Sequence, residues 1–388
     1  MQATRILTIK AKKPLYKGEE LAERVELIEL NDVGFEIVSQ KDLYKIGDRA
    51  VYIQPDYCVS DTPIFESFIR PFGDESKSML GKVNGLPRRI RAKKFGLHKG
   101  DGMPVYSNGI LLPLNEVAII YPDFMSSSKD YDEILGITKW EEPEETETPG
   151  LQSGSGRSFP EGIYKTDETD INNLWGHMEK LGFPMYLVGT EKVDGSSISI
   201  GVKAGEPLIL SRKLSKPMQV KKVVGRRKKT FWEKVAFWKN PDLNIIEKVD
   251  NDDDFVKAGK PYLDLLLKKG FTNIILRGEL NGSGSKGSGN KYNPASKLAK
   301  NIKFFGIDKI NNLGIAEKMS YQEFCDTANP LQLPMVEVIF LQSFANKEDL
   351  QYAASQYFKD NLIEGIVVRT LDSKFSAKIM NPEYDSKK

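Results

Sequence analysis

Lys192 lies in the segment Glu191-Lys192-Val193-Asp194-Gly195, and a lysine amine can act as a nucleophile once it has lost its proton. An isolated Lys-x-Asp-Gly match is weak, because four residues of this kind occur by chance in many chains. Here other segments follow in order: Ser211-Arg212-Lys213, Leu276-Arg277-Gly278-Glu279-Leu280, Lys303-Phe304-Phe305-Gly306-Ile307-Asp308, Ile363-Glu364-Gly365-Ile366-Val367-Val368-Arg369 and Ser376-Ala377-Lys378. Their cations and carboxylates suit chemistry at a phosphate.

In this order the six segments resemble motifs I, Ia, III, IIIa, IV and V of the covalent nucleotidyltransferases. That superfamily includes ATP-dependent DNA and RNA ligases and messenger-RNA capping enzymes. Six ordered matches within roughly two hundred residues make coincidence an inadequate explanation. The resemblance implies that Lys192 attacks the α-phosphate of ATP, forms a phosphoramidate and releases pyrophosphate.

The resemblance also implies a role for single residues. In the family the matching positions contact the ribose (Arg212, Glu279), stack on adenine (Phe304 or Phe305), engage the metal (Glu364) and contact the α-phosphate (Lys378). Glu191, Val193 and Gly195, beside the nucleophile, complete the expected nucleotide site. Taken singly, Arg212 and Glu279 could equally be surface charges, and the two phenylalanines could be core residues on opposite faces of a strand.

The proposed chemistry asks for these residue types. A free lysine has a pKa near 10.4, and bringing it to about 7 requires roughly 4 to 5 kcal/mol of differential stabilisation. Lys378, Arg212 and a divalent ion held by Glu279 or Glu364 would supply it, and they would also screen the phosphate charge. Oxygen ligands select Mg²⁺ or Mn²⁺.

The elements that must position these residues fall into two domains, an α+β organisation. Short strand-like runs at 5–9, 25–30, 35–38, 50–53 and 110–114 predict an OB-like β-barrel over residues 1–135. Residues 136–158, rich in Glu, Pro, Gly and Ser, predict a linker. Residues 159–388 are expected to form an antiparallel-sheet nucleotidyltransferase domain, with Lys192 at a turn between two strands. A helix is predicted from Glu168 to Leu181 with Asp167 as its cap, and others from Ser320 and over 347–357.

The order of the domains distinguishes members of the superfamily. DNA ligases and capping enzymes place an OB domain after motif V, whereas here ten residues follow Lys378 and the β-rich domain comes first. The chain therefore resembles the ATP-dependent 3'-OH RNA ligases that carry an amino-terminal OB-like domain, also in residues 159–168 and 289–292. This resemblance implies sealing of 3'-OH and 5'-phosphate ends, at nicks in duplexes, through an AMP-capped 5' end. Departures are Ala377 in motif V and enlarged segments before and after motif III.

The expected partner is RNA, as a nicked duplex or an RNA/DNA hybrid. A net charge of +2 says little, so the local basic runs matter more. The nucleic-acid-binding candidates are Arg88, Arg89, Arg91, Lys93, Lys94, Arg226, Arg227, Lys228 and Lys229, although a solvated loop would explain them equally well. The alternatives are a DNA ligase, a capping-type guanylyltransferase or a non-catalytic OB-containing RNA-binding protein.

The remaining features place the protein in a reducing, aqueous compartment. Cys58 and Cys325 are far apart in sequence and form no recognisable disulfide framework, and no apolar run is long enough to cross a membrane. We expect a monomer in the cytoplasm, or in the host cytoplasm if the protein is viral.

Overall fold

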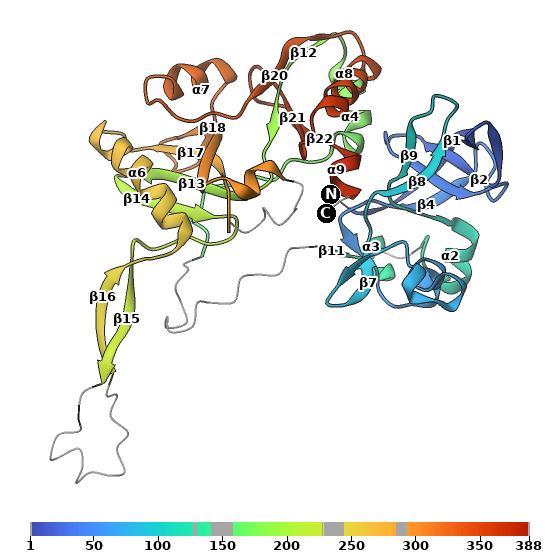
Figure 1. The fold of residues 1–388 in the computed structure, drawn as a ribbon, viewed down its shortest axis with the longest axis horizontal. Coiled ribbons are helices and arrows are strands. Elements are labelled where there is room, and N and C mark those ends of the chain that lie inside the picture. Colours follow the sequence, from blue (N-terminus) through green and yellow to red (C-terminus); the bar gives the residue numbers. More distant parts are fainter. Residues whose placement is uncertain are drawn as a thin grey trace.

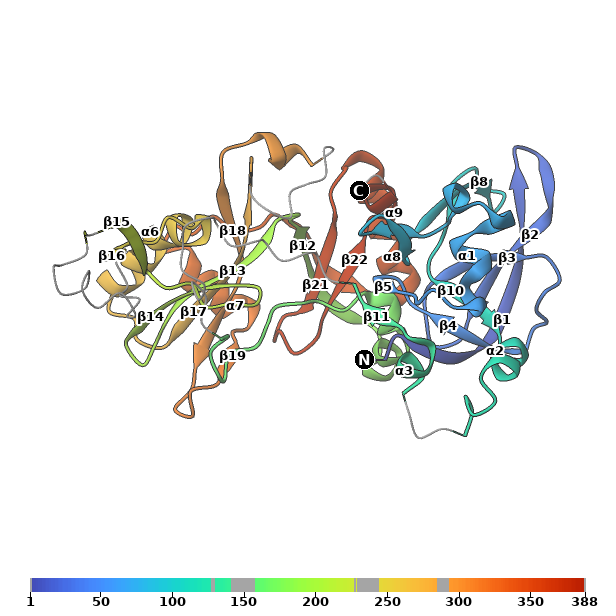
Figure 2. The same ribbon diagram turned by 90° about the horizontal axis from the view of Figure 1, so that it is seen from below.

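The computed structural model describes residues 2–126, 130–140, 158–226, 228, 244–284 and 293–386. An amino-terminal part and a carboxy-terminal part lie side by side (Figures 1 and 2). Both mix helices with sheets, and neighbouring strands within each described sheet run antiparallel. The predicted mixture of α and β elements is confirmed.

The amino-terminal part contains two sheets. The larger one consists of β1 (Thr4–Lys17), β2 (Glu20–Leu30), β3 (Glu36–Gln40), β4 (Arg49–Ile53), β8 (Lys93–His98), β9 (Pro104–Ser107) and β10 (Ile110–Pro113). The smaller one consists of β5 (Tyr57–Cys58), β6 (Gly81–Val83), β7 (Leu86–Arg89) and β11 (Thr138–Lys139). Helical segments are η1 (Pro63–Phe65), α1 (Glu66–Ile69), η2 (Pro71–Gly73), η3 (Glu75–Lys77), α2 (Leu114–Ile120) and α3 (Tyr131–Leu135).

The five strands predicted here are confirmed, but the described residues do not close into a barrel. The long β1 pairs with β2, β4 and β8, so the larger sheet curls around it. Its two edges meet at single hydrogen bonds, from Asn108 N to Glu36 O at 3.0 Å and from Val38 N to Ser107 Oγ at 3.0 Å. No continuous ladder joins β3 to β9 or β10 within the described residues, so the hydrogen-bond pattern is that of a curled sheet.

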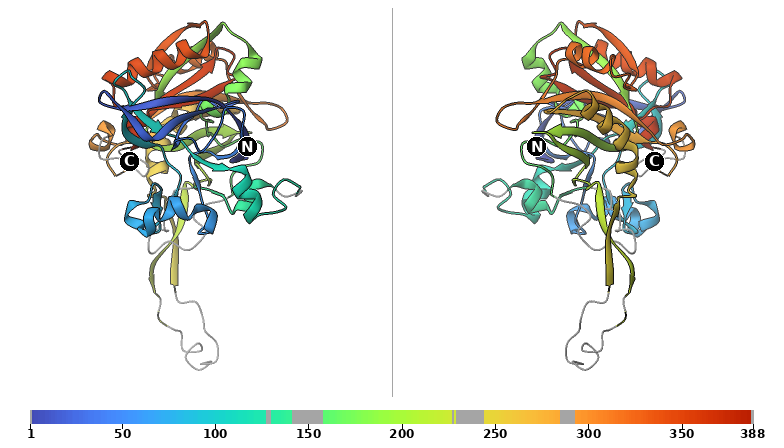
Figure 3. Two further views of the ribbon diagram at one scale, coloured as in Figure 1. Left: turned by 90° about the vertical axis from the view of Figure 1, so that its right-hand side faces the viewer. Right: turned by 90° about the vertical axis from the view of Figure 1, so that its left-hand side faces the viewer.

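The carboxy-terminal part is built on two further sheets and a separate hairpin. One sheet has β12 (Met185–Lys192), β20 (Val338–Phe344), β21 (Gly365–Thr370) and β22 (Ser376–Met380). The other has β13 (Ser196–Lys203), β14 (Glu206–Ser211), β17 (Ile274–Asn281), β18 (Asn301–Ile310) and β19 (Ala316–Lys318). The hairpin is β15 (Gln219–Arg226) and β16 (Asn244–Asp250), and it projects from the body (Figures 1 and 3).

Helical segments accompany these sheets. They are η4 (Ile171–Asn173), α4 (Trp175–Leu181), α6 (Asp254–Lys268), η5 (Pro294–Lys297), α7 (Tyr321–Ala328), α8 (Lys347–Asp360) and α9 (Pro382–Ser386). The helix predicted from Ser320 is confirmed as α7, which opens with a capping box formed by Ser320 and Glu323, and α8 begins at its predicted residue. Leu263 and Leu266 of α6 bury against the β13 sheet, and Leu350 and Ala354 of α8 bury against the β12 sheet.

The predicted start of the helix after the linker is wrong. Asp167 caps no helix; the cap is Asp170, whose side chain accepts from the N–H of Asn172, and the α-helical turns begin only at Trp175. The reason is a long-range pairing. Lys378 N donates to Thr169 O at 2.9 Å and a parallel bridge joins Asp170 to Lys378, so this segment stays extended along β22.

A buried polar network ties β18 to β13 and β17. The Arg277 guanidinium on β17 lies 2.6 Å from Asp308 on β18 and donates to Ser199 Oγ at 2.9 Å. The Tyr164 hydroxyl donates to the other Asp308 oxygen at 2.6 Å. Arg277 and Asp308 are both 2% exposed, so each charge is compensated only by this pairing.

The two parts meet at the turn that holds η4. Gly34 N donates to Asn172 O at 3.0 Å and the Arg5 guanidinium donates to Asn173 Oδ1 at 2.9 Å. On another side, α9 lies against β8, as Figure 2 shows. Among the described residues there is no helix whose length and hydropathy would allow it to cross a membrane.

Candidate active site

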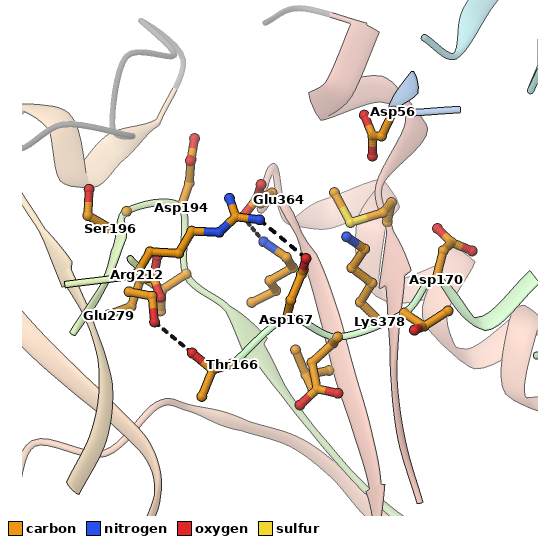
Figure 4. A pocket seen from close by; sticks show the side chains of 18 of the residues that line it. Asp56, Thr166, Asp167, Asp170, Asp194, Ser196, Arg212, Glu279, Glu364 and Lys378 are labelled. Carbon is orange, nitrogen blue, oxygen red and sulfur yellow. Dashed lines mark hydrogen bonds and ion pairs between the residues drawn. The ribbon is translucent and has the colours of Figure 1, made fainter. Parts of the chain in front are cut away.

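A cavity of about 810 Å³ lies where the two parts meet. The carboxy-terminal part contributes the segments singled out in the sequence, including Lys192, Glu279, Glu364 and Lys378 (Figure 4). The amino-terminal part contributes residues that sequence reasoning did not connect with them, namely Phe35, Gln54, Asp56, Asn108, Lys139 and Trp140. A cavity of this size accommodates a nucleotide-sized ligand.

Lys192 is the last residue of β12 and pairs in register with Gly365 on β21. This register places it beside Glu364, the residue before Gly365, and the Lys192 Nζ lies 2.5 Å from Glu364 Oε2. The Lys192 side chain is 24% exposed and that of Glu364 is 8% exposed. The amine is thus accessible from the cavity, while its carboxylate partner is nearly removed from water.

The turn after Lys192 explains the Asp and Gly of the motif. The Asp194 carboxylate is 8% exposed and accepts a hydrogen bond of 2.7 Å from the hydroxyl of Tyr384, which is 1% exposed. A Cβ on Gly195 would lie 2.5 Å from Leu280 O and 2.9 Å from Glu279 Cγ. Only glycine therefore allows the turn to approach β17 this closely.

Glu279 lies opposite Ser197 on β13 and opposite Lys303 on β18. Burial, together with repulsion from Glu364 and Asp194, raises the pKa of Glu279 to about 8, against the opposing effect of the Lys192 and Arg212 charges. Ionised carboxylates this close together repel one another, and a bound divalent cation would offset that repulsion. Glu279 and Glu364, the two residues predicted to hold a divalent ion, thus lie close enough for their charges to interact.

The acidic groups available to a metal ion are few. The described part of the chain contains no group of three or more His, Cys, Asp or Glu side chains that could hold one by themselves. Glu279 and Glu364 offer hard oxygen donors, which fit Mg²⁺ or Mn²⁺ that completes its coordination with phosphate oxygens and water. The residues present therefore fit a metal that is shared with a nucleotide.

Asp167 connects three segments of the cavity wall. Its Oδ2 accepts from the Arg212 guanidinium at 3.2 Å and from Lys139 Nζ at 3.1 Å, and Lys378 is another charge that acts on it (Figure 4). Lys139 comes from β11 of the amino-terminal part. The Asp167 carboxylate thus links Arg212 of the carboxy-terminal part to Lys139 of the amino-terminal part, a role that its sequence position did not reveal.

The two motif IIIa phenylalanines point to opposite faces of β18. Phe304 is fully buried in the core and packs edge-on against Tyr262, with ring centroids 4.8 Å apart. Phe305 lines the cavity, and the Arg369 guanidinium lies 5.6 Å from its ring centroid. Of the pair, only Phe305 is placed to stack on a bound base, and Phe304 is a core residue.

Glu191 and Val193, on either side of the proposed nucleophile, also line the cavity. Burial raises the pKa of Glu191, and repulsion by Glu337 adds to the effect.

The nucleic-acid-binding candidates of the amino-terminal part lie in different environments. Arg89 lines the cavity, where its guanidinium lies 2.8 Å from Asp56 and 3.5 Å from the ring centroid of Trp140. Lys94 lies 3.9 Å from Glu383 of α9. Arg88 and Arg91 are partly buried, and Lys93 is exposed at the start of β8.

The other basic candidates belong to the projecting hairpin. Arg226 ends β15, where its Nε donates to Asn244 Oδ1 at 3.2 Å, and Lys228 is exposed. Arg227 and Lys229 lie outside the described residues.

Comparison with known proteins identifies the architecture. A family model described as RNA ligase matches residues 185–380, just over half of the chain. Among solved structures, a lysine mutant of the Naegleria gruberi RNA ligase with ATP and Mn is 21% identical, with a TM-score of 0.69, and the match covers 100% of this chain and 99% of that chain. A second mutant of that protein, with AMP and Mn, is 22% identical over 100% and 99%, with a TM-score of 0.67. The same protein with PPi matches at 21% identity and a TM-score of 0.66, over 99% and 98%. These likenesses show a shared fold, and a search of curated proteins found no match.

Proposed function

The chain belongs to the RNA ligase family, and we propose that it uses ATP to join the 3'-OH and 5'-phosphate ends of RNA through an adenylate carried on Lys192. The observation that supports this most directly is the position of Lys192. Its amine opens into the cavity that also contains Glu279, Glu364, Arg212 and Lys378, while the carboxylate that holds it is nearly buried.

In the first step the neutral Lys192 amine attacks the α-phosphorus of ATP. A P–N bond forms, the P–O bond to pyrophosphate breaks, and the amine loses its proton to solvent or to a neighbouring carboxylate. Arg212 and Lys378 line the same wall and would neutralise the phosphate charge, and Phe305 would stack on adenine. Glu279 and Glu364 would hold the Mg²⁺ or Mn²⁺, which would withdraw charge from the phosphates when bound.

The two later steps use the same groups. The 5'-phosphate of the RNA attacks the phosphorus of the adenylate, which breaks the P–N bond and returns Lys192 to its starting state. The 3'-OH of the other end then attacks the capped 5'-phosphate, forms the phosphodiester and releases AMP. Lys192 is not needed as a nucleophile in this last step.

The substrate that we propose is a nicked duplex with RNA at the break. The amino-terminal part, proposed to be OB-like, would face it with Arg88, Arg89, Arg91, Lys93 and Lys94. Proteins read RNA duplexes by shape, phosphates and 2'-hydroxyls, and a cavity between two parts suits a break held across their junction. We further propose that the enzyme acts as a monomer in the cytoplasm, where the thiols of Cys58 and Cys325 stay reduced.

The test separates the steps. Protein incubated with ATP labelled at the α-phosphate and Mg²⁺ or Mn²⁺ should become labelled on a denaturing gel, and Lys192→Ala should not. With a nicked duplex that already carries the AMP cap, Lys192→Ala should still seal the break. Labelling from GTP alone, or labelling that survives in Lys192→Ala, would overturn the proposal.

A further inference from the structure

The β15–β16 hairpin is a two-stranded arm that stands apart from both larger sheets of the carboxy-terminal part. Figures 1 and 3 show it extending from the body toward the same side as the smaller sheet of the amino-terminal part. Near its base Val220 is 8% exposed, whereas beyond it Val224 and Ile245 are 47% and 42% exposed. A two-stranded hairpin is only marginally stable by itself in water, so a repulsive pair of residues on facing strands is not expected in it unless the pair has another role.

The strand register gives the hairpin two different faces. Lys221 lies opposite Lys248, and on the same face this pair is flanked by Val223 with Ile246 toward the tip and by Gln219 with Asp250 at the base. On the other face, Lys222 lies opposite Glu247. Successive residues of a strand point to opposite sides, and cross-strand partners share a side. Lys221 therefore faces another lysine across the hairpin, whereas Lys222 faces a glutamate.

The Lys221–Lys248 pair does not stabilise the arm. Like charges directly opposite each other on a sheet are destabilising, whereas opposite charges such as Lys222 and Glu247 are favourable. Within the described residues, neither Lys221 nor Lys248 is recorded in an ion pair. This face thus carries two ammonium groups directly opposite each other, with an aliphatic pair beyond them and a single carboxylate, Asp250, at the base. The repulsion between the two ammonium groups is relieved when an anion lies across them.

We propose that the face formed by Lys221, Lys248, Val223 and Ile246 binds the phosphate backbone of the RNA duplex at a distance from the break. The inference rests on the proposed function, because a duplex held with its break at Lys192 is the polyanion available to the arm. Lys221 follows Lys216 of the cavity wall by five residues, a span of at most roughly 18 Å of extended chain, so the contact lies a few base pairs from the reacting ends. The aliphatic pair would contact sugars in the wide, shallow minor groove of RNA.

The arm therefore adds affinity for long duplexes without taking part in the chemistry. It makes no contact with Lys192, Glu279 or Glu364 in the described structure, since none of its residues lines the cavity. Phosphate contacts of this kind carry no sequence preference.

The test compares two double substitutions on opposite faces. Lys221→Gln with Lys248→Gln removes the like-charged pair, and Lys222→Gln with Glu247→Gln is the matched control on the other face. The binding of nicked RNA duplexes, one with arms long enough to reach the hairpin and one with short arms, is measured over a series of salt concentrations.

The first variant should bind the long duplex between about 10- and 60-fold more weakly at about 0.1 M salt, and its plot of log K against log[salt] should lose a slope of about 2. Its binding to the short duplex and its labelling by ATP should match those of wild type, and its melting temperature should be no lower, because the substitutions remove a repulsive pair. An equal loss in the control variant, no loss in the first variant, or an equal loss with the short duplex would overturn the inference. Failure of wild type to become labelled by ATP would instead overturn the proposed function.

Discussion

Tyr384→Phe should slow the adenylylation of Lys192 while leaving the fold intact. The phenol lies in α9, close to the carboxy-terminal end, yet its hydroxyl donates to the Asp194 carboxylate in the turn that follows the nucleophile. Phenylalanine fills the same space without the oxygen. The change therefore removes one hydrogen bond and creates no cavity.

The size of the effect follows from the groups involved. A hydrogen bond to a charged group contributes about 1.5–3 kcal/mol. If this free energy is what holds the turn after Lys192 in its reactive position, its loss slows adenylylation by roughly 10- to 150-fold, because 1.4 kcal/mol corresponds to a factor of ten in rate. Since Tyr384 touches no atom that reacts, it is a positioning residue, and the loss should appear in the rate at saturating ATP more than in the ATP concentration needed.

The assay is a single-turnover measurement of adenylylation over a range of ATP concentrations, together with the melting temperature. Tyr164→Phe is the matched control, because it also removes a buried hydroxyl bonded to a carboxylate, that of Asp308 at 2.6 Å, in a network that does not line the cavity. Both variants should lose some stability, but only Tyr384→Phe should lose rate. The reasoning is refuted if Tyr384→Phe reacts as fast as wild type, or if its rate falls no more than that of Tyr164→Phe.

The other predictions concern single groups of the same site. Gly195→Ala should abolish adenylylation, because its Cβ would lie 2.5 Å from Leu280 O; a labelled adduct formed at the wild-type rate would contradict this. Phe305→Ala should weaken ATP binding in a titration and change stability little, whereas Phe304→Ala should cost about 3–5 kcal/mol of unfolding free energy in a denaturant titration. Burial raises the pKa of Asp170 to about 6, so the contribution of this one group to stability falls as pH rises from about 4 to about 6, where it holds its proton in the folded state but not in the unfolded state. Asp170→Asn keeps the helix cap and removes this pH dependence, so its free energy of unfolding should rise by about 1–2 kcal/mol relative to wild type between pH 4 and 7. This is less than the full pKa shift implies, because the side chain keeps some contact with water. Equal curves of stability against pH for the two proteins would contradict the prediction.

Sequence reasoning succeeded where chemistry and local pattern coincide. The order of the motifs singled out Lys192, Glu279, Glu364 and Lys378, and all four line one cavity. Alternation along β18 predicted that Phe304 and Phe305 face opposite ways. Which of the two faces the cavity depends on the side of the sheet that α6 covers, and that is a tertiary fact.

What the sequence did not reveal are pairings between distant segments. Asp167 is a residue type that often caps helices, but the pairing of Thr169 and Asp170 with Lys378 keeps that segment extended. Trp140 lies at the edge of the segment expected to be a linker, and β11 beside it joins the smaller amino-terminal sheet. Because such contacts join residues many positions apart, no local propensity encodes them.

The Lys192–Glu364 contact has a consequence for the order of events. Glu364 is held near the amine by the register of β12 with β21, and the same carboxylate is one of the two proposed to hold a metal ion. One nearly buried carboxylate oxygen cannot be fully engaged by an ammonium and by a divalent cation at the same time. We infer that a divalent cation arriving with the nucleotide displaces the Lys192 amine from Glu364, and that Glu364→Gln would remove both this restraint and a metal ligand. Adenylylation by Glu364→Gln should therefore require a higher metal concentration than in wild type, and a rate that stays low at saturating metal would contradict this explanation.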